Sequence, residues 1–353
     1  MRFAMPERRA TAIWRNLLSI FCFGVASVAL PAWADAPGKG TSIFSPESTP
    51  ANSILHLSWF VLAITGGIFL TVGGLLAWVL IRYRARKTDD ESEPAQIYGS
   101  TQVELAWTVI PILIVVVLFL TTARIIFAIQ DAPKPQAALN VTVVGHQFWW
   151  EFRYPKLGII TANELHVPMS TPLDPRPTFL HLLSADVDHS FWVPELAGKT
   201  DLIPNHPNDM WIDPRYAGVY LGQCAQFCGI EHAMMLLRVY VDTPEQFDAW
   251  VKQQQQPGVQ DPAVAAGRHI FETEACTNCH RISGTAAAGT FGPDLTHLAS
   301  RATIAAGAAD NTPENLRAWI ANPDHFKPGV LMPAMQLSDE QINEVVAYLS
   351  TLH

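Results

Sequence analysis

Basic residues are scarce in this sequence, and cysteines are few. The 353 residues include 23 lysines and arginines against 32 aspartates and glutamates, which gives a formal net charge of −9. Because the chain has no basic run and no interleaving of basic with aromatic residues, nucleic acid is not an expected partner. The sequence also lacks any recognisable grouping of a nucleophile with a general acid and base, so bond-making catalysis is not expected of this chain.

Apolar residues, in contrast, are abundant. They make up 49% of the chain, and the mean hydropathy is positive, so part of the chain is expected to lie in a membrane. Residues 1–34 combine four arginines, an apolar run and a terminal Ala-Trp-Ala, which is the pattern of a cleavable signal peptide. Cleavage after Ala34 would remove Cys22, one of the five cysteines, and would leave the mature amino terminus outside the cytoplasm.

Two apolar stretches, residues 53–83 and 105–130, are each long enough to cross about 30 Å of hydrocarbon as a helix. The first ends in a cluster of basic residues that begins at Arg82, and the positive-inside rule places such a cluster in the cytoplasm. The sequence therefore predicts a two-helix transmembrane hairpin, with an external segment at residues 35–52 and a cytoplasmic loop at residues 84–104.

The composition changes twice after the hairpin. Residues 138–243 contain short β-rich stretches separated by Pro, Gly, Asp and Asn, which predicts an all-β sandwich. Thr243 can cap a short helix that leads into a run of glutamines, so residues 244–261 are expected to form a helix followed by a flexible linker. Residues 262–353 are rich in alanine and in helical patterns, and they predict an all-α domain.

One short loop has an unusual density of soft metal ligands. It reads Cys224-Ala-Gln-Phe-Cys228-Gly-Ile-Glu-His232-Ala-Met-Met235, and thiolates together with a thioether favour copper. A blue-copper ion uses one thiolate, two imidazoles and a weak axial thioether, so the second cysteine is one ligand too many for a single ion. Two copper ions bridged by both sulfurs would use it, and His189 offers the second imidazole.

Two other structures are compatible with cysteines at this spacing. C-x3-C in an exported protein often forms a disulfide, and cysteine with histidine can hold a single zinc ion. The presence of His232, Met235 and His189 at ligand spacing argues against a simple disulfide. Methionine is a poor zinc ligand, so copper is favoured.

A second cofactor motif lies in the predicted helical domain. Cys276-Thr-Asn-Cys279-His280 has the pattern C-x-x-C-H, the attachment signature of c-type haem, in which two thioethers hold the haem and the histidine binds its iron. A thioredoxin-like dithiol would also show C-x-x-C, but the βαβ pattern that accompanies it is absent. A methionine later in the chain is expected to be the second iron ligand.

Together these motifs resemble subunit II of the haem-copper cytochrome c oxidases, extended by a class I cytochrome c. In that family the copper loop reads Cys-x-Glu-x-Cys-x-x-x-His-x-x-Met, and the distant histidine lies in His-Ser-x-x-Val-Pro. The resemblance implies a cupredoxin-like Greek-key fold for residues 138–243 and a class I cytochrome c fold for residues 262–353. It implies a dinuclear copper centre, called CuA, with these ligands: His189, Cys224, the backbone carbonyl of Gln226, Cys228, His232 and Met235.

The resemblance also implies roles outside the copper ligands. The stretch from Lys327 to Pro333 resembles the family's Lys-Pro-Gly-x-x-Met-Pro loop, which implies Met332 rather than Met335 as the second iron ligand. Glu104 lies in a segment that resembles Glu-x-x-Trp-Thr-x-x-Pro, and the family places this glutamate at the mouth of a proton channel into subunit I. Gln226 replaces a glutamate that helps to hold magnesium in the family, which puts a magnesium site in doubt here.

The aromatic stretch Phe148-Trp149-Trp150 matches the region of the family where electrons arrive from soluble cytochrome c. The family usually has Trp in place of Phe148. This substitution, together with a tethered haem, suggests that external electrons enter at the haem domain instead.

The function implied by the resemblance is electron transfer in a proton-translocating cytochrome c oxidase. Electrons would pass from the chain's own haem c to CuA and on to the haem of subunit I, where oxygen is reduced to water. Expected partners are subunit I, a subunit III, and an external cytochrome c or other periplasmic donor. The expected location is a bacterial inner membrane, with both cofactor domains on the periplasmic side.

Two rival functions use the same motifs. The chain could be the electron-input subunit of a CuA-containing nitric oxide reductase, or a membrane-tethered protein that delivers copper during oxidase assembly. A copper-delivery protein does not need a haem, so the motif from Cys276 to His280 argues against it.

Overall fold

The computed structural model describes residues 41–84, 96, 98–136, 138–259 and 261–353. The predicted signal peptide and much of the predicted cytoplasmic loop lie outside the described residues. From Thr41 onward the chain forms one compact unit.

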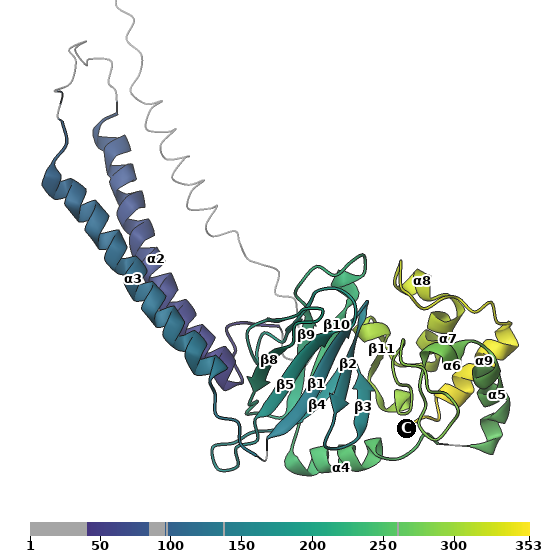
Figure 1. Ribbon diagram of the computed structural model, residues 1–353. Helices are drawn as coiled ribbons and strands as arrows, with labels where there is room; N and C mark the ends of the chain where they lie inside the picture. The colour runs from purple at the N-terminus through teal and green to yellow at the C-terminus, as the bar shows by residue number, and fades with distance from the viewer. Residues whose placement is uncertain (1–40, 85–95, 97, 137, 260) are drawn as a thin grey trace, which may run out of the picture. The chain divides into compact units, whose positions relative to one another are not determined.

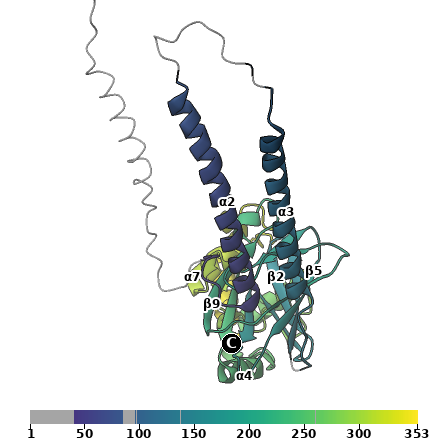
Figure 2. The ribbon, with the colours of Figure 1, turned by 90° about the vertical axis from the view of Figure 1, so that its left-hand side faces the viewer.

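Two long helices, α2 (Thr49–Arg82) and α3 (Thr101–Gln130), contact each other (Figures 1 and 2). Both are long and apolar enough to cross a membrane, as the two apolar stretches predict, and each begins about one turn earlier than expected. Pro111 lies inside α3 without ending it. Membrane helices tolerate such a proline where neighbouring groups satisfy the freed carbonyl.

Both helices are tied to the strand β8 (Asn208–Ile212) and its flank. The carboxylate of Asp213, directly after β8, accepts a hydrogen bond from the backbone amide of Thr49 at 2.6 Å. A negative charge at this place also complements the helix dipole at the start of α2. Trp211 donates its indole N–H to the carbonyl oxygen of Ile129, in the last turn of α3, at 2.8 Å. These contacts fix the ends of the hairpin against the β domain.

The β domain is a sandwich of two five-stranded sheets, as predicted. The strand orders are β3-β2-β1-β5-β8 and β4-β10-β9-β6-β7. Strands β1 and β5 pair in parallel, as do β4 and β10, so strands that are distant in sequence lie side by side. Besides β8, the strands are β1 (Leu139–His146), β2 (Trp149–Tyr154), β3 (Ile159–Ala162), β4 (Glu164–Pro168), β5 (Thr178–Ser184), β6 (His189–Trp192), β7 (Thr200–Leu202), β9 (Gly218–Cys224) and β10 (Leu236–Asp242).

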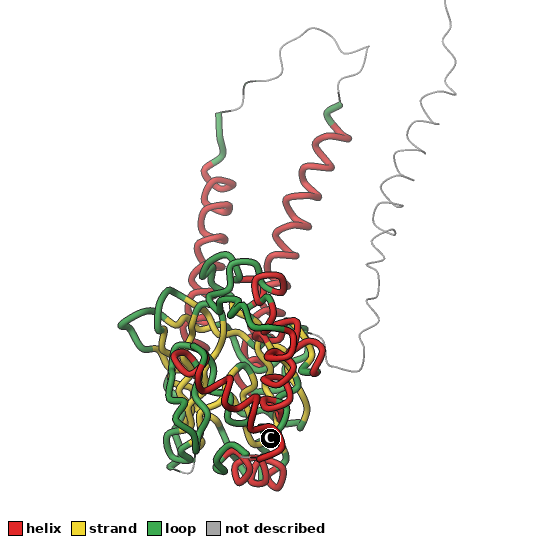
Figure 3. Tube along the Cα trace, turned by 90° about the vertical axis from the view of Figure 1, so that its right-hand side faces the viewer, coloured by secondary structure: helices red, strands yellow, loops and turns green. Residues whose placement is uncertain are grey.

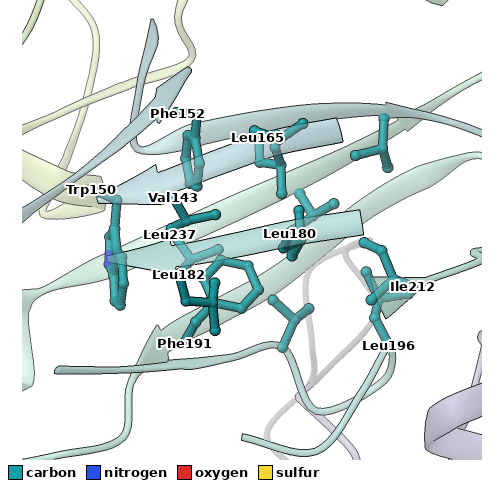
Figure 4. Close-up of a cluster of buried hydrophobic side chains, with 14 of the residues drawn as sticks. Val143, Trp150, Phe152, Leu165, Leu180, Leu182, Phe191, Leu196, Ile212 and Leu237 are labelled. Carbon is teal, nitrogen blue, oxygen red and sulfur yellow. The ribbon is translucent and has the colours of Figure 1, made fainter. Parts of the chain in front are cut away.

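Figure 4 shows side chains that fill the space between the two sheets. Trp150 from β2, Leu180 from β5 and Phe191 from β6 are fully buried in this cluster. Burial alternates along β10, as expected for a strand that presents one face to a core. Each large apolar side chain buried here contributes roughly 1.5–3 kcal/mol, so the core gives the loops at its end a rigid support.

The carboxyl-terminal residues form a helical domain, drawn mostly as red and green tube in Figure 3. Its helices α5 (Ala265–Thr273) and α9 (Asp339–Leu349) cross closely at Gly267. The close approach needs a glycine there, because a Cβ on Gly267 would overlap the carbonyl oxygen of Glu344. The helical domain also contains these short elements: η2 (Pro262–Val264), α6 (Cys276–Cys279), η3 (Leu298–Ser300), β11 (Thr303–Ile304), η4 (Ala305–Gly307), β12 (Ala309–Asp310), α7 (Pro313–Ala321) and α8 (Pro323–Phe326).

The run of glutamines between the two domains is not a free coil. Helix α4 (Pro244–Gln254) begins with a capping box, as predicted, and it includes the first of these glutamines. The side-chain amide of Gln253 donates to the hydroxyl of Ser300 at 2.9 Å, and that of Gln255 donates to the carbonyl of Leu157 at 2.9 Å. The prediction of a flexible linker is therefore wrong for this part, because its side chains bond to both domains.

Candidate copper and haem sites

Two neighbouring strands and the loop after one of them carry the five predicted copper-binding side chains. His189 is the first residue of β6, and Cys224 is the last residue of β9. These strands pair, with Phe191 opposite Cys224, so the imidazole and the thiol meet at one end of the sheet. The loop between β9 and β10 supplies the other thiol, imidazole and thioether, and it contains the turn η1 (His232–Met234).

The two sulfur atoms of the cysteines lie at the centre of this group. Cys224 Sγ and Cys228 Sγ are 3.9 Å apart, well beyond the 2.05 Å of a disulfide bond. His189 Nδ1 lies 3.9 Å from Cys224 Sγ, whereas His232 Nδ1 lies 3.7 Å from Cys228 Sγ. Met235 Sδ lies 3.9 Å from Cys228 Sγ. The arrangement therefore offers one imidazole to each side of a pair of sulfurs.

The remaining predicted ligand is the carbonyl oxygen of Gln226, which lies 3.2 Å from Cys224 Sγ. Gln226 itself is exposed. The two cysteines, His189 and Met235 are all buried. A largely buried set of two thiols, two imidazoles and a thioether fits soft metal ions such as copper.

Asp186 orients the first imidazole. Its Oδ1 accepts a hydrogen bond from His189 Nε2 at 2.8 Å, which leaves Nδ1 free to face Cys224. Burial opposes protonation of His189, but the hydrogen bonds with Asp186 and Cys224 outweigh it and raise the pKa of this histidine. A carboxylate behind a metal-binding histidine is the common device that fixes its tautomer.

The paired thiols affect each other's ionisation. The hydrogen bond between the two sulfurs, followed by the contact with His189, lowers the pKa of the Cys224 thiol. A thiolate is the form that binds metal, so the site is prepared for a cation.

The haem motif lines a mainly apolar cavity in the helical domain. Cys276, Cys279 and His280 all face it, with apolar side chains from α7 and α9. His280 Nδ1 bonds to the carbonyl oxygen of Pro293 at 2.8 Å, so Nε2 remains for an iron ion. Burial lowers the pKa of His280 and keeps the imidazole neutral, as metal binding requires. The residues present therefore fit a covalently attached haem.

Glycine is required beside His280. A Cβ on Gly292 would lie 2.7 Å from His280 Cε1, which no larger residue could accommodate without moving the ring. Met332 and Met335 both line the cavity. The geometry brings both near the haem motif, and the preference for Met332 depends on the pattern of its loop.

Four residues of the β sandwich also line the haem cavity: Gln147, Phe148, Trp149 and Asn163. Phe148 and Trp149 are buried, and Trp150 has no exposed surface. A separate donor protein could not touch these rings in this arrangement, because Phe148 and Trp149 face the cavity of the helical domain and Trp150 lies in the core of the sandwich. Sequence reasoning missed this shared wall, since no local pattern shows that the two domains meet there.

The turn between β1 and β2, which includes Gln147 and Phe148, also contacts the copper loop. Gln147 donates its side-chain amide to the carbonyl oxygen of Cys228 at 2.6 Å. A Cβ on Gly229 would lie 2.9 Å from the ring of Phe148, so this ring packs directly on the copper loop. The turn from Gln147 to Trp149 therefore lies between the two candidate cofactor sites.

Glu104, the predicted mouth of a proton channel, lies in the first turn of α3 and is exposed. It is far in sequence from the copper and haem sites, and the structure does not bring it into either of them.

Three family models match successive parts of the chain. "Cytochrome C oxidase subunit II, transmembrane domain" matches residues 39–125, "Cytochrome C oxidase subunit II, periplasmic domain" matches residues 159–241, and "Cytochrome c" matches residues 264–353. With the two apolar helices, these matches fit a two-pass membrane protein.

Known proteins show the same similarity over most of the chain. Cytochrome c oxidase subunit 2 of Alkalihalophilus pseudofirmus is 36% identical over 304 residues, which cover 84% of this chain and 85% of the relative. The same subunit of Bacillus sp. (strain PS3) is 34% identical and covers 76% of this chain and 80% of the relative. The solved periplasmic domain of subunit II of cytochrome oxidase of Bradyrhizobium japonicum is 27% identical, covers 34% of this chain and 96% of that chain, and has a TM-score of 0.32.

Proposed function

Because the chain belongs to the cytochrome c oxidase subunit II family and carries a cytochrome c domain, we propose that it receives electrons on its own haem c and passes them through CuA to the haem of subunit I. The chain is thus part of an oxidoreductase in which other subunits complete the reaction. Reduction of oxygen to water and proton translocation would take place in subunit I.

One observation supports this proposal most strongly, namely the turn that the two candidate sites share. Phe148 lines the haem cavity and packs on Gly229 of the copper loop. Electron transfer over short distances needs no moving carrier, so a side chain in contact with both sites gives a direct route. Phe148 and Trp149 are buried, which also keeps water from this route.

His189, Cys224, Cys228, His232, Met235 and the carbonyl oxygen of Gln226 would hold the dinuclear copper. When bound, the copper would take up and release single electrons. The contribution of the chain is rigidity. Two ligands lie on paired strands of a packed sandwich, and Asp186 fixes the tautomer of one histidine. Little then needs to rearrange when the charge of the site changes.

Cys276 and Cys279 would hold the haem covalently, and His280 and Met332 would bind its iron. When bound, the haem supplies a second one-electron site. The hydrogen bond from His280 to Pro293 fixes the imidazole ring, and the apolar walls keep water from the iron. Both effects tune the reduction potential.

The partners and location follow from the family. Subunit I is the expected electron acceptor, subunit III a further neighbour, and an external cytochrome c or other periplasmic protein the donor. We place the chain in a bacterial inner membrane with both cofactor domains in the periplasm and Glu104 at the cytoplasmic end of α3. There Glu104 would open a proton channel into subunit I, while Gln226 leaves the family's magnesium site without its usual carboxylate.

A reduction experiment on the purified complex tests the proposed route. Reduced cytochrome c is mixed with the purified complex in the absence of oxygen. The absorbance bands of haem c and of the subunit I haem are then followed over time in the wild type and in Cys224→Ser. Because a bridging thiolate serves both copper ions, the variant should lose the copper signal and keep a reducible haem c, while reduction of the subunit I haem slows at least about a hundredfold. Undiminished reduction of that haem in the variant would refute the route.

Activity assays on the same purified complex distinguish the proposed function from the two rival functions. A nitric oxide reductase would turn over nitric oxide and not oxygen. A copper-delivery protein would transfer its copper to an oxidase precursor and would not remain in a complex that consumes oxygen.

A further inference from the structure

A lysine of the helical domain is buried against the copper domain. Lys327 follows α8 in the loop that leads to Met332, and it is only 1% exposed. Its Nζ donates hydrogen bonds to the carbonyl oxygens of Met234 at 3.0 Å and Phe148 at 3.2 Å. The first carbonyl belongs to the copper loop and the second to the turn between the two sites. One side chain therefore joins the haem's methionine loop to both segments of the copper domain.

The charge of this lysine is costly to bury. An ammonium group leaves water only at a large cost unless it is hydrogen-bonded and near an opposite charge. The nearby carboxylate of Glu231 favours the charged lysine, and Glu231 is itself buried. In the described part of the chain, Oε2 of Glu231 has no hydrogen-bond partner. An apolar residue at this position would leave the carbonyl oxygens of Met234 and Phe148 without this donor and Glu231 without its nearby positive charge. Because such losses destabilise a buried site, the lysine favours the one position in which all three partners are close to it.

A second anchor joins the domains through a different segment. The carboxylate of Glu164, the first residue of β4, is buried and accepts hydrogen bonds from the amides of Ala302 at 3.2 Å and Thr303 at 2.9 Å. The hydroxyl of Thr303 also donates to it at 2.9 Å. These amides have their acceptor in the other domain, so they report directly on whether the domains touch.

The backbone of the helical domain also lies close to side chains of the copper domain. A Cβ on Gly329, two residues after Lys327, would lie 2.7 Å from Cγ2 of Ile230 in the copper loop, and one on Gly307 would lie 3.0 Å from Cβ of Leu236. Each of these glycines also has a positive φ, a conformation that glycine adopts without strain.

We propose that Lys327 and Glu164 lock the helical domain in one position on the copper domain, so that the chain's own haem domain is a docked partner of the copper loop and not a tethered, diffusing donor. This inference rests on the proposed function, since it explains how the two cofactor sites would stay in register. A flexible tether, in contrast, would only raise the local concentration of the haem domain near the copper domain.

Hydrogen exchange of the Ala302 and Thr303 amides in the purified complex tests the lock. In the wild type, both amides should exchange at least about a hundredfold more slowly than in an unstructured peptide, because exchange needs undocking. Lys327→Met keeps the aliphatic stem and removes two charge-assisted hydrogen bonds, so exchange should accelerate at least about tenfold. Lys327→Arg keeps donors and should stay within about threefold of the wild type.

Matched controls separate docking from folding. Lys156→Met makes the same change at an exposed lysine and should leave these amides unchanged. The amides of α5 should also keep their wild-type rates in Lys327→Met, and the haem should stay attached, because the helical domain itself remains folded. If α5 exchanges faster too, Glu164→Ala replaces Lys327→Met as the test variant. Lys327 is then intact, and the side-chain amide of Gln253, which bonds to Ser300 of the helical domain, reports on undocking.

Two results would overturn the lock. Wild-type Ala302 and Thr303 amides that exchange at the rate of an unstructured peptide would show that the docked state is not populated. Unchanged exchange in Lys327→Met would show that this lysine does not hold the domains together. Neither result bears on the copper and haem spectra, so a failed lock and a failed proposed function remain distinguishable.

Discussion

Asp186→Asn should weaken copper binding, although it changes one side chain by a single atom and touches no ligand-forming atom. Both carboxylate oxygens of Asp186 act as acceptors. Oδ2 accepts from the backbone amide of Gln147 at 2.7 Å, while Oδ1 accepts from the amide of Val187 at 2.7 Å and from His189 Nε2 at 2.8 Å. An asparagine has only one acceptor oxygen, so in either orientation its NH₂ group meets an N–H donor.

The size of the effect follows from the bond that is lost. Leaving a buried donor without its acceptor costs about 1–3 kcal/mol, and changes behind a metal-binding histidine typically reduce metal affinity about 10–100-fold. These two estimates agree, since each factor of ten in affinity corresponds to about 1.4 kcal/mol. We therefore expect copper affinity to fall about 10–100-fold, with the protein still folded because the sandwich core is untouched.

Competition with a copper chelator of known affinity measures this effect on the purified protein. Asp188→Asn is the matched control, because Asp188 is exposed, lies two residues away and undergoes the same substitution. It should retain wild-type affinity. Equal copper affinity in Asp186→Asn and Asp188→Asn would refute the reasoning that Asp186 orients His189 for a metal.

Three further predictions follow from the haem domain and its contact. Met332→Ala should leave the haem covalently attached, because attachment uses only Cys276, Cys279 and His280. The variant should lower the reduction potential of the haem and abolish the near-infrared absorption band of methionine–iron ligation. If only Met335→Ala abolished the band, the ligand assignment would be reversed. A chain truncated after Gln256 should keep its copper and lose most oxidase turnover with soluble cytochrome c; full turnover would show that the copper domain alone accepts external electrons. Burial lowers the pKa of Lys327 to about 8, from about 10.4 in an exposed lysine, so the undocked form binds more protons between these values and docking should strengthen as pH rises through that window. Protection of the Ala302 and Thr303 amides, corrected for the intrinsic pH dependence of exchange, measures this. The part of the dependence that comes from Lys327 should vanish in Lys327→Met, whereas Glu231 and Cys228, the other ionisable groups that act on this lysine, are the same in both proteins.

The sequence predicts the local structure well, because each prediction depends on residues that are close together in the chain. The apolar stretches predict α2 and α3, and the capping residues Thr243 and Ser338 stand where α4 and α9 begin. The copper loop and the C-x-x-C-H motif are short as well, so the sequence alone shows that their side chains lie close together. Pairing of β6 with β9 then brings His189 to Cys224.

Contacts between distant residues could not be predicted in the same way. Asp186 supports His189 through a turn geometry that no spacing rule specifies, and Lys327 looks in the sequence like an ordinary charged residue at a loop start. Its burial depends on carbonyl oxygens about 90 and 180 positions earlier in the chain. For the same reason the polar run around Gln253 predicts a flexible linker, although its amides bond to both domains.

Electron paramagnetic resonance of the oxidised, purified complex, combined with its copper and haem content, tests the central claim most directly. The account predicts two subunit II copper ions and one covalently bound haem per chain, with a signal in which one unpaired electron is shared equally by two copper nuclei. A signal from a single copper nucleus, zinc in place of copper, or a Cys224–Cys228 disulfide in the purified complex would contradict it.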